Sequence, residues 1–358
     1  MTQGISPWTR RDFLPPAPGG PSEGTPSASG LRRNAEVTHW PENETDPTAA
    51  SGTGTVDAAS GVHTLRDARD ALTKQRLDSF RRSMTGVYHR PLVGDDLHWD
   101  ALGDMHVAAP FTMARHFDDQ AKTIVKNKDL VSRAAARAHL SPAVLIRVQE
   151  GRGTPSEICA LTQSLIDAVS EQHPEMEWSP ATIREWMFNC GIGIDCAGYA
   201  QQAYLAASGL TRSGARFASI AYESLSGLEQ RGFRKLASVA DVRAGDIVSL
   251  SSHERGEVGH RAIVYDQHVA SASDMRALLA WGAGAQAFAV GGPIRVLQLD
   301  SSWGCGGSSH RGGVKRETFW HNESTGKWAH QAPSDRPFAA SPDLYGEKLD
   351  GFFRGQGC

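Results

Sequence analysis

Apolar residues recur at helical spacing through the middle of the chain. One such series covers residues 65–84, with Thr64 placed to cap its start. Ser141 and Thr154 are each followed by proline, which puts a capping hydroxyl before a residue suited to the first helical position. The sequence therefore predicts a helical region over residues 63–175.

After residue 176 the pattern changes from helical spacing to short β-type runs. A helical stretch over residues 200–207 comes first, and turn residues separate the runs that follow. These runs are residues 246–250, 261–265, 294–299 and 349–354. One helix followed by several short strands is typical of an α+β domain and not of a doubly wound parallel sheet.

The start of the chain has a different composition. The first 60 positions hold 8 of the 18 prolines, together with 7 Gly and 14 Ser or Thr. The apolar residues there are scattered, so they bury too little surface to offset the entropy of ordering the chain. We predict three parts: a disordered N-terminal tail over 1–62, a helical domain over 63–175 and an α+β domain over 176–358.

Charge and hydropathy argue against several classes of partner. The chain has 37 Lys+Arg against 40 Asp+Glu, a net charge of −3, which makes nucleic acid an unlikely partner. The apolar stretch 277–290 is shorter than the roughly 20 residues that span a bilayer. Residues 9–14 resemble a twin-arginine export motif, but Pro and Gly follow where an apolar region is needed. We expect no classical signal peptide and no membrane contact, with synthesis in the cytoplasm and any export through a specialised secretion system.

The five cysteines are irregularly spaced and include no Cys-x-x-Cys pair. We therefore expect neither a disulfide framework nor a zinc module, and we expect no cofactor. Cys159 and Cys190 are interpreted as core thiols.

Cys196 is the thiol best placed for chemistry. It follows a turn containing Gly193 and Asp195, at the point where the next helix begins. The positive end of the helix and its unpaired N–H groups favour a thiolate, and the same N–H groups can stabilise an oxyanion. An ordinary buried thiol at a helix start fits this segment equally well.

A cysteine nucleophile needs a base and, in a triad, a group that orients the base. His260 opens the strand 261–265 after a polar hairpin tip, which makes it the first candidate among the downstream histidines. The others are His253, His268, His310 and His321. Asp300 ends the next apolar strand, where it would orient His260 and stabilise its cationic form. An Asp that merely starts a turn is the ordinary alternative.

In this order the motifs resemble the NlpC-type cysteine peptidases, which are papain-like enzymes that mostly cut peptidoglycan stem peptides. The resemblance covers residues 180–356. The matching segments are Asp195-Cys196-Ala197-Gly198 for the nucleophile, 243–248 for the strand entry, 259–264 for the histidine strand and 349–354 for the closing strand. Asp300 falls where the family places its third polar residue.

The resemblance implies a papain-like domain in which a nucleophile helix packs on a small antiparallel sheet. It also implies amide hydrolysis in which Cys196 attacks, His260 transfers the proton and Asp300 orients His260, with a peptidoglycan peptide as substrate. The sequence departs from the family in two ways. No Tyr lies about ten residues before the nucleophile, and the stretch 267–293 is longer than the family has, so we expect an insertion near the cleft.

Three alternative functions stay open. The same triad behind a disordered tail suits an effector or toxin that cleaves or deamidates a target protein, with the tail contacting a secretion machine or chaperone.

Residues 133–156 resemble a phage-repressor helix-turn-helix, which would make the chain a DNA-binding regulator. His139 stands where that turn usually has Gly, and the reading helix is apolar, so a capped bundle helix is favoured. A weak resemblance to lytic transglycosylases would make Glu150 catalytic.

Overall fold

The structure is a computed structural model that describes part of the chain. The described residues are 58–89, 104–112, 123–209, 228–229, 232–251, 258–303, 312–330, 338, 340–344 and 347–355. Every described residue belongs to one compact unit, Gly52–Cys358. Of the predicted disordered tail, residues 1–57 lie outside the described residues, whereas residues 58–62 are helical, so the predicted boundary at 62 is wrong.

The first helix, α1 (Ala58–Ser83), begins earlier than the sequence predicts. Thr64 lies inside this helix, so the predicted N-cap at that position is wrong. A capping residue favours a helix start but does not prevent a helix from extending past it. Although α1 has 26 residues, it is polar along much of its length. None of the described helices is both long enough and apolar enough to cross a membrane.

A short hairpin-like pair of strands follows α1. Strand β1 (Thr85–Tyr88) pairs antiparallel with β2 (Met105–Ala108). Each strand has only four residues, which is too few for an alternating pattern to stand out in the sequence. The sequence analysis did not predict this pair.

The capping signals of the middle region are confirmed. Helices α3 (Lys128–Arg137), α4 (Pro142–Gln149) and α5 (Pro155–Gln172) follow one another, and α6 (Pro180–Asn189) comes next. The side chain of Ser141 accepts the N–H of Val144 at the start of α4. At the start of α5, Thr154 and Glu157 exchange hydrogen bonds in a capping box.

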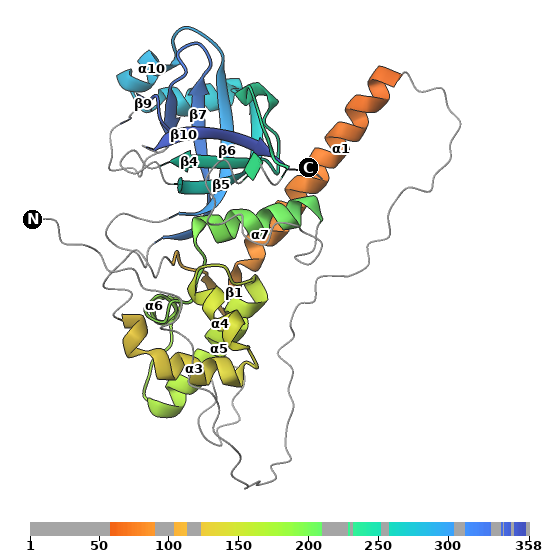
Figure 1. Cartoon of the computed structure of the whole chain (residues 1–358). Helices are drawn as coiled ribbons and strands as arrows, with labels where there is room; N and C mark the ends of the chain where they lie inside the picture. Colours follow the sequence, from red (N-terminus) through yellow and green to blue (C-terminus); the bar gives the residue numbers. More distant parts are fainter. Residues whose placement is uncertain are drawn as a thin grey trace, which may run out of the picture. The chain divides into compact units, whose positions relative to one another are not determined.

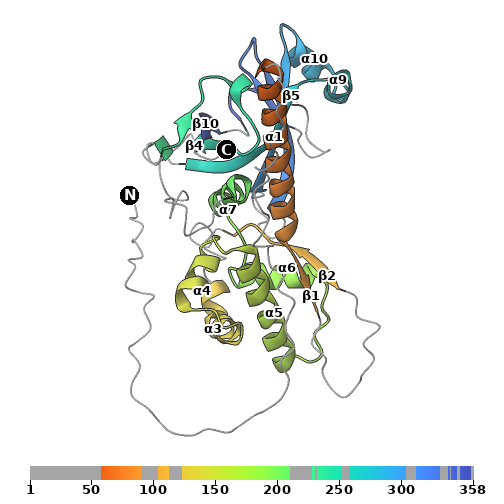
Figure 2. The same cartoon turned by 90° about the vertical axis from the view of Figure 1, so that its right-hand side faces the viewer.

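Helix α7 (Cys196–Ser208) ends at Gly209, which adopts a left-handed conformation. Nearly all residues of α7 are buried, on every side of the helix, as expected of a helix enclosed by other elements. It contacts α1 along one side and strands of the large sheet along another (Figures 1 and 2).

The C-terminal region forms a curled antiparallel sheet, so the predicted α+β class is confirmed. Its order is β3-β10-β4-β5-β6-β7-β8-β9. The strands are β3 (Arg234–Lys235), β4 (Ile247–Ser251), β5 (Val258–Val269), β6 (Ile294–Trp303), β7 (Gly313–Asn322), β8 (Trp328–His330), β9 (Ala340–Ser341) and β10 (Lys348–Arg354), and a 3₁₀ turn covers Val239–Asp241. The four predicted β runs correspond to β4, β5, β6 and β10.

The two faces of the sheet belong to different hydrophobic cores. Ile247 and Ile263 join the core that includes the helices. Val248 and Ala262, their neighbours in sequence, join a second core on the other face of the sheet. This alternation follows from the period of two along a strand, and it decides below which side chains can meet.

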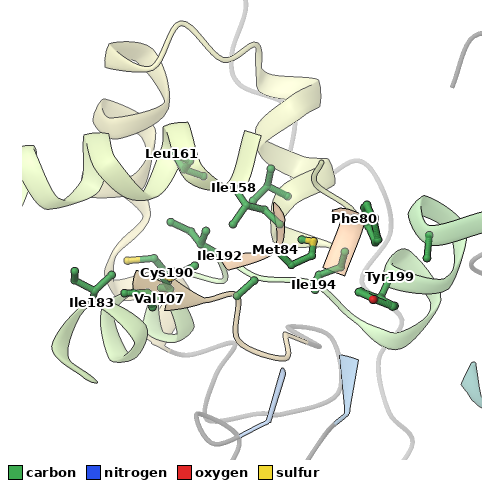
Figure 3. Close-up of a cluster of buried hydrophobic side chains, with 14 of the residues drawn as sticks. Phe80, Met84, Val107, Ile158, Leu161, Ile183, Cys190, Ile192, Ile194 and Tyr199 are labelled. Carbon is green, nitrogen blue, oxygen red and sulfur yellow. The ribbon is translucent and has the colours of Figure 1, made fainter. Parts of the chain in front are cut away.

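The helix-side core reaches from α1 to the segment that precedes α7. Figure 3 shows Phe80 of α1 beside Tyr199 of α7, and Ile192 close to Ile158 of α5, with Ile194 in the same core. The rings of Phe80 and Tyr199 lie 5.3 Å apart. The chain leading into Cys196 is therefore packed on both sides by buried apolar residues.

The stretch 267–293 forms the end of β5 and two short helices, α9 (Ala272–Leu279) and α10 (Ala283–Ala289). These helices pack with Trp320 and Phe338 in a third, smaller core. They follow the C-terminal end of β5, whereas Cys196 contacts its N-terminal part through Arg261. Seven or eight residues of strand, roughly 25 Å at 3.3 Å per residue, separate the two. Along β5, this stretch thus lies at the end away from Cys196.

Candidate functional site

The turn that precedes α7 is held by backbone hydrogen bonds to two other segments. Ile194 donates its N–H to the carbonyl of Pro110, and its own carbonyl accepts the N–H of Thr112. The N–H of Asp195 donates to the carbonyl of Gly151 at 3.0 Å. Strand β6 adds a further bond, because the Ser302 hydroxyl donates to the Ile194 carbonyl at 2.7 Å. The start of α7 is thus fixed from three directions.

Asp195 and Gly198 of the Asp-Cys-Ala-Gly motif have structural tasks. The Asp195 carboxylate caps α7 by accepting the N–H of Gly198 at 2.5 Å. A Cβ on residue 198 would lie 2.1 Å from the carbonyl oxygen of Gly151, so only glycine fits there. Neither task involves the thiol of Cys196.

Cys196 is the first residue of α7 and is 8% exposed. Its sulfur accepts a hydrogen bond from the backbone N–H of Arg261 on β5. Burial raises the pKa of the Cys196 thiol to about 12, and the Asp195 carboxylate adds to the rise. The expectation that the helix end lowers the pKa of Cys196 is therefore wrong for this structure. Loss of hydration outweighs the helix dipole.

His260 lies on the face of the sheet opposite Arg261. Its imidazole stacks on the indole of Trp303, with ring centroids 4.3 Å apart and planes 23° apart. Burial lowers the pKa of His260 to about 4, with a small opposing effect from the Glu317 carboxylate. The imidazole is therefore neutral at pH 7. The β5 residue that interacts with the Cys196 sulfur is Arg261, and the imidazole of His260 lies on the other face of the strand.

Asp300 is fully buried and forms a two-pronged ion pair with Arg316 of β7. Arg316 Nε donates to Oδ1 at 2.7 Å, and Nη2 donates to Oδ2 at 2.8 Å. Asp300 stands opposite Ile263 in the β5–β6 ladder. It therefore shares the face of Ile263, which is not the face of His260. Of the three predicted site residues, the structure brings Cys196 next to the strand of His260 but does not bring the three side chains together.

The Arg316 guanidinium links the sheet to α1. Besides Asp300, it donates to Asp78 of α1 at 2.9 Å, and it lies 3.1 Å above the ring centre of Tyr265. The Tyr265 hydroxyl donates to the same Asp78 carboxylate at 2.9 Å. Asp300 thus belongs to a network that attaches α1 to β5, β6 and β7.

The Gly-Asp pair before β4 also has a structural explanation. Asp246 is fully buried, and both its carboxylate oxygens accept hydrogen bonds from Arg354 of β10, at 2.9 and 2.7 Å. The backbone N–H of Arg243 donates to the same carboxylate at 2.7 Å. Asp246 therefore joins the closing strand to the start of the sheet, which is a folding role and not a chemical one.

Charged groups of both signs surround the Cys196 thiol. Asp195 and Glu347 act on it as anions, and Arg261 acts as a cation. Burial raises the pKa of Asp195 to about 6, while the N–H of Gly198 and the charge of Arg152 oppose the rise. The Glu347 carboxylate lies beside the start of β5, where a Cβ on Gly259 would be 2.8 Å from it.

The other candidate histidines do not supply a second base near this thiol within the described part of the chain. His253 and His310 lie outside the described residues. His268 sits farther along β5, between Asp266 at 3.2 Å and Asp274 at 3.1 Å. His321 lies near the far end of β7, against the ring of Trp328.

Sequence reasoning missed Arg261, Ser301 and Ser302. Ser301 donates its hydroxyl to the carbonyl of Arg261 at 2.7 Å, and both residues are fully buried. The available signal was a charged residue inside an apolar strand, since a buried arginine requires a partner. Among the described residues, no group of three or more His, Cys, Asp or Glu is arranged to hold a metal ion.

The region that resembles a helix-turn-helix forms two helices joined by a tight turn. His139 in this turn has a φ of +54°, the left-handed conformation that favours glycine. The only basic residue of α4 is Arg147, and its guanidinium is paired with the carboxylate of Glu157. Helix α4 therefore has little charge to offer a phosphate backbone. Cys190 is fully buried and Cys159 packs against the same core, which confirms both as core thiols.

Comparisons with known proteins add nothing to this geometry. No family model matches the chain, and neither a curated protein nor a solved structure matches it. The function must therefore be argued from the residues around Cys196.

Proposed function

We propose that the chain is a thiol-dependent amide hydrolase with Cys196 as its nucleophile and a papain-like arrangement of helix and sheet. One observation carries this proposal. The Cys196 sulfur lies at the start of α7 and is held by the N–H of Arg261, the residue next to His260. A thiol at a helix start is the nucleophile half of the arrangement that acyl transfer through sulfur requires, and the neighbouring histidine is the candidate base that has to be brought to it.

The reaction has two steps. The Cys196 sulfur attacks the amide carbonyl carbon, and the C–N bond breaks as the amine leaves with the proton given up by the thiol. Water then attacks the resulting thioester, releasing the acid and restoring the thiol. The backbone N–H of Cys196 helps to stabilise the oxyanion in both steps, because the N–H groups of Ala197 and Gly198 are bonded to the Asp195 carboxylate.

The proton passes to His260 in this proposal. Because burial raises the pKa of Cys196 to about 12 and lowers that of His260 to about 4, transfer of the proton from the thiol to the imidazole is strongly uphill in this geometry. The resting site is therefore a neutral thiol and a neutral imidazole. Because the imidazole and the thiol lie on opposite faces of the sheet, turnover requires β5 to rearrange at His260 when substrate enters, so that the imidazole leaves Trp303 and reaches the thiol.

Asp300 is not needed as an orienting group in this scheme, because Arg316 occupies both its carboxylate oxygens. We propose Asp300 as a structural residue that fixes β6 and β7 below the site. The predicted triad is thereby reduced to a Cys196–His260 pair, and an assay can separate the two versions.

The resemblance noted in the sequence suggests peptidoglycan stem peptides as substrate. The test is mass spectrometry of muropeptides after incubation with the full chain, Cys196→Ala, and Cys159→Ala as the matched control. We expect new cleavage products with the full chain and with Cys159→Ala, and none with Cys196→Ala. Products that persist with Cys196→Ala would overturn the proposal.

The base is tested in the same assay. We expect His260→Ala to lose turnover nearly as fully as Cys196→Ala, while His253→Ala and His310→Ala keep it. If His310→Ala or His253→Ala is inactive and His260→Ala is active, the base lies in one of those segments. If a general amide reporter is cleaved but muropeptides are not, the substrate is a different amide, such as one in a target protein.

A further inference from the structure

Arg261 is a fully buried arginine in the middle of an apolar strand. It stands opposite Ser249 in the β4–β5 ladder and alternates with His260 and Ala262, so it faces the side of the sheet that carries α7. Helix α7 packs on β5 from this side, and the charge of Arg261 acts on both Asp195 and Cys196 at the start of that helix. A buried arginine is found where it is neutralised by anions.

The backbone of Arg261 is fixed on both sides. Its N–H donates to the Cys196 sulfur, and its carbonyl accepts the hydroxyl of Ser301 at 2.7 Å. On the neighbouring segment, Ser302 holds the carbonyl of Ile194 at 2.7 Å. Two consecutive serines of β6 thus fix the positions of both the strand and the turn that meet at the sulfur.

We propose that Arg261 is the positioning residue that sets the reactivity of Cys196. Its N–H holds the sulfur in place, and its buried guanidinium stabilises the thiolate once the proton has left. This inference rests on the proposed function, and it names the group that controls the nucleophile of that site. His260 then accepts the proton during turnover, whereas Arg261 is the cation that stands beside the thiolate this leaves.

The balance of charges around the sulfur supports this assignment. Asp195 and Glu347 raise the pKa of Cys196, together with burial, whereas Arg261 lowers it through both its N–H and its charge. When Cys196 ionises, Arg261 gains a second anion beside Asp195. An imidazole on the far face of the sheet cannot supply this attraction.

The experiment measures the rate at which iodoacetamide alkylates Cys196, followed by peptide mapping, between pH 7 and pH 10. Arg261→Met and Arg261→Lys are compared with the full chain. Loss of an adjacent cation raises a pKa by about one to three units. Each unit lowers the thiolate population about tenfold, and the greater nucleophilicity of a more basic thiolate restores about threefold. We therefore expect Arg261→Met to be alkylated about 3- to 40-fold more slowly, and Arg261→Lys to be closer to the full chain.

The matched control is Arg316→Met, which removes another largely buried arginine from the same sheet without touching the thiol. We expect its alkylation rate to equal that of the full chain. Equal rates for Arg261→Met and the full chain would overturn the proposal, as would an equal loss in Arg316→Met. His260→Ala separates this proposal from the function itself, because we expect it to lose turnover while its alkylation rate stays unchanged.

Arg261→Met leaves Asp195 without one of its cations and can fail to fold. Asp195→Asn provides the second test, because the amide oxygen can still cap α7 while the negative charge near the sulfur is removed. We expect alkylation of Cys196 in this variant to be about threefold faster or more. A slower rate would contradict the charge balance on which the role of Arg261 depends.

Discussion

His260 makes the stability of the fold depend on pH in a way that can be isolated. Its ring is 7% exposed and stacks on Trp303, and burial lowers its pKa from 6.5 to about 4. Because the folded state disfavours the charged imidazole, the stabilisation is complete above pH 6.5. It is lost as the pH falls from 6.5 through 4.

The magnitude follows from the two pKa values. With 6.5 in the unfolded chain and about 4 in the folded one, the free energy of unfolding attributable to His260 falls by about 2 kcal/mol at pH 5 and about 3 kcal/mol at pH 4, relative to pH 8. This is a large fraction of the 5–15 kcal/mol that stabilises a typical domain. The effect should therefore be visible in ordinary denaturation curves.

The assay is urea denaturation at half-unit steps from pH 8 to pH 4, for the full chain and for His260→Gln. We expect the stability difference between them to change by about 3 kcal/mol across this range, with the glutamine variant relatively more stable in acid. His268→Gln is the matched control, since it removes a partly exposed imidazole from the same strand. A constant difference for His260→Gln, or an equal change for His268→Gln, would refute the buried, neutral imidazole.

Asp195 opposes His260 over the same pH range, which is why a variant is needed. Burial raises its pKa from 3.8 to about 6, so the folded state disfavours the carboxylate. Its effect on stability is therefore favourable in acid and is lost as the pH rises through 6. The two groups partly cancel in the full chain, and only the difference between a variant and the full chain separates them.

Three further results are expected. Gly198→Ala places a Cβ 2.1 Å from the carbonyl oxygen of Gly151, so we expect it to lower the free energy of unfolding by about 3 kcal/mol or more in denaturant titrations. Asp300→Ala leaves Arg316 with one carboxylate fewer, so we expect the free energy of unfolding to fall by about 3 kcal/mol while the alkylation rate of Cys196 stays unchanged. Full stability together with lost turnover would instead favour the Cys196–His260–Asp300 triad. Deletion of residues 1–57 should leave the melting temperature unchanged, and a fall would show that the tail contributes to the fold.

Local signals allowed the sequence to predict the helices and their starts. Ser141, Thr154 and Asp195 each place a side-chain oxygen where it accepts a backbone N–H of the following helix, and the structure has helices α4, α5 and α7 beginning at those points. Capping depends on three or four consecutive residues, so it survives without knowledge of the rest of the fold. Thr64 failed because the preceding residues continue the same helix.

The arrangement of the site depends on non-local register, which the sequence does not reveal. His260 and Asp300 each lie at a strand position where the sequence predicts them. Their faces depend on the pairing of Asp300 with Ile263, and a shift of one residue in that pairing would reverse the outcome. The sequence analysis identified the strands correctly but had no means of choosing between the two faces.

The end of β6 organises the site more than any single catalytic candidate does. Asp300 fixes the arginine of β7 and, through it, α1. Ser301 fixes the strand that carries His260, Ser302 fixes the turn before Cys196, and Trp303 holds the imidazole on the far face. Because adjacent residues of a strand point to opposite faces, one short segment reaches both the nucleophile and its proposed base. In the proposed reaction, a movement of this segment would therefore alter the hydration of the thiol and of the imidazole together.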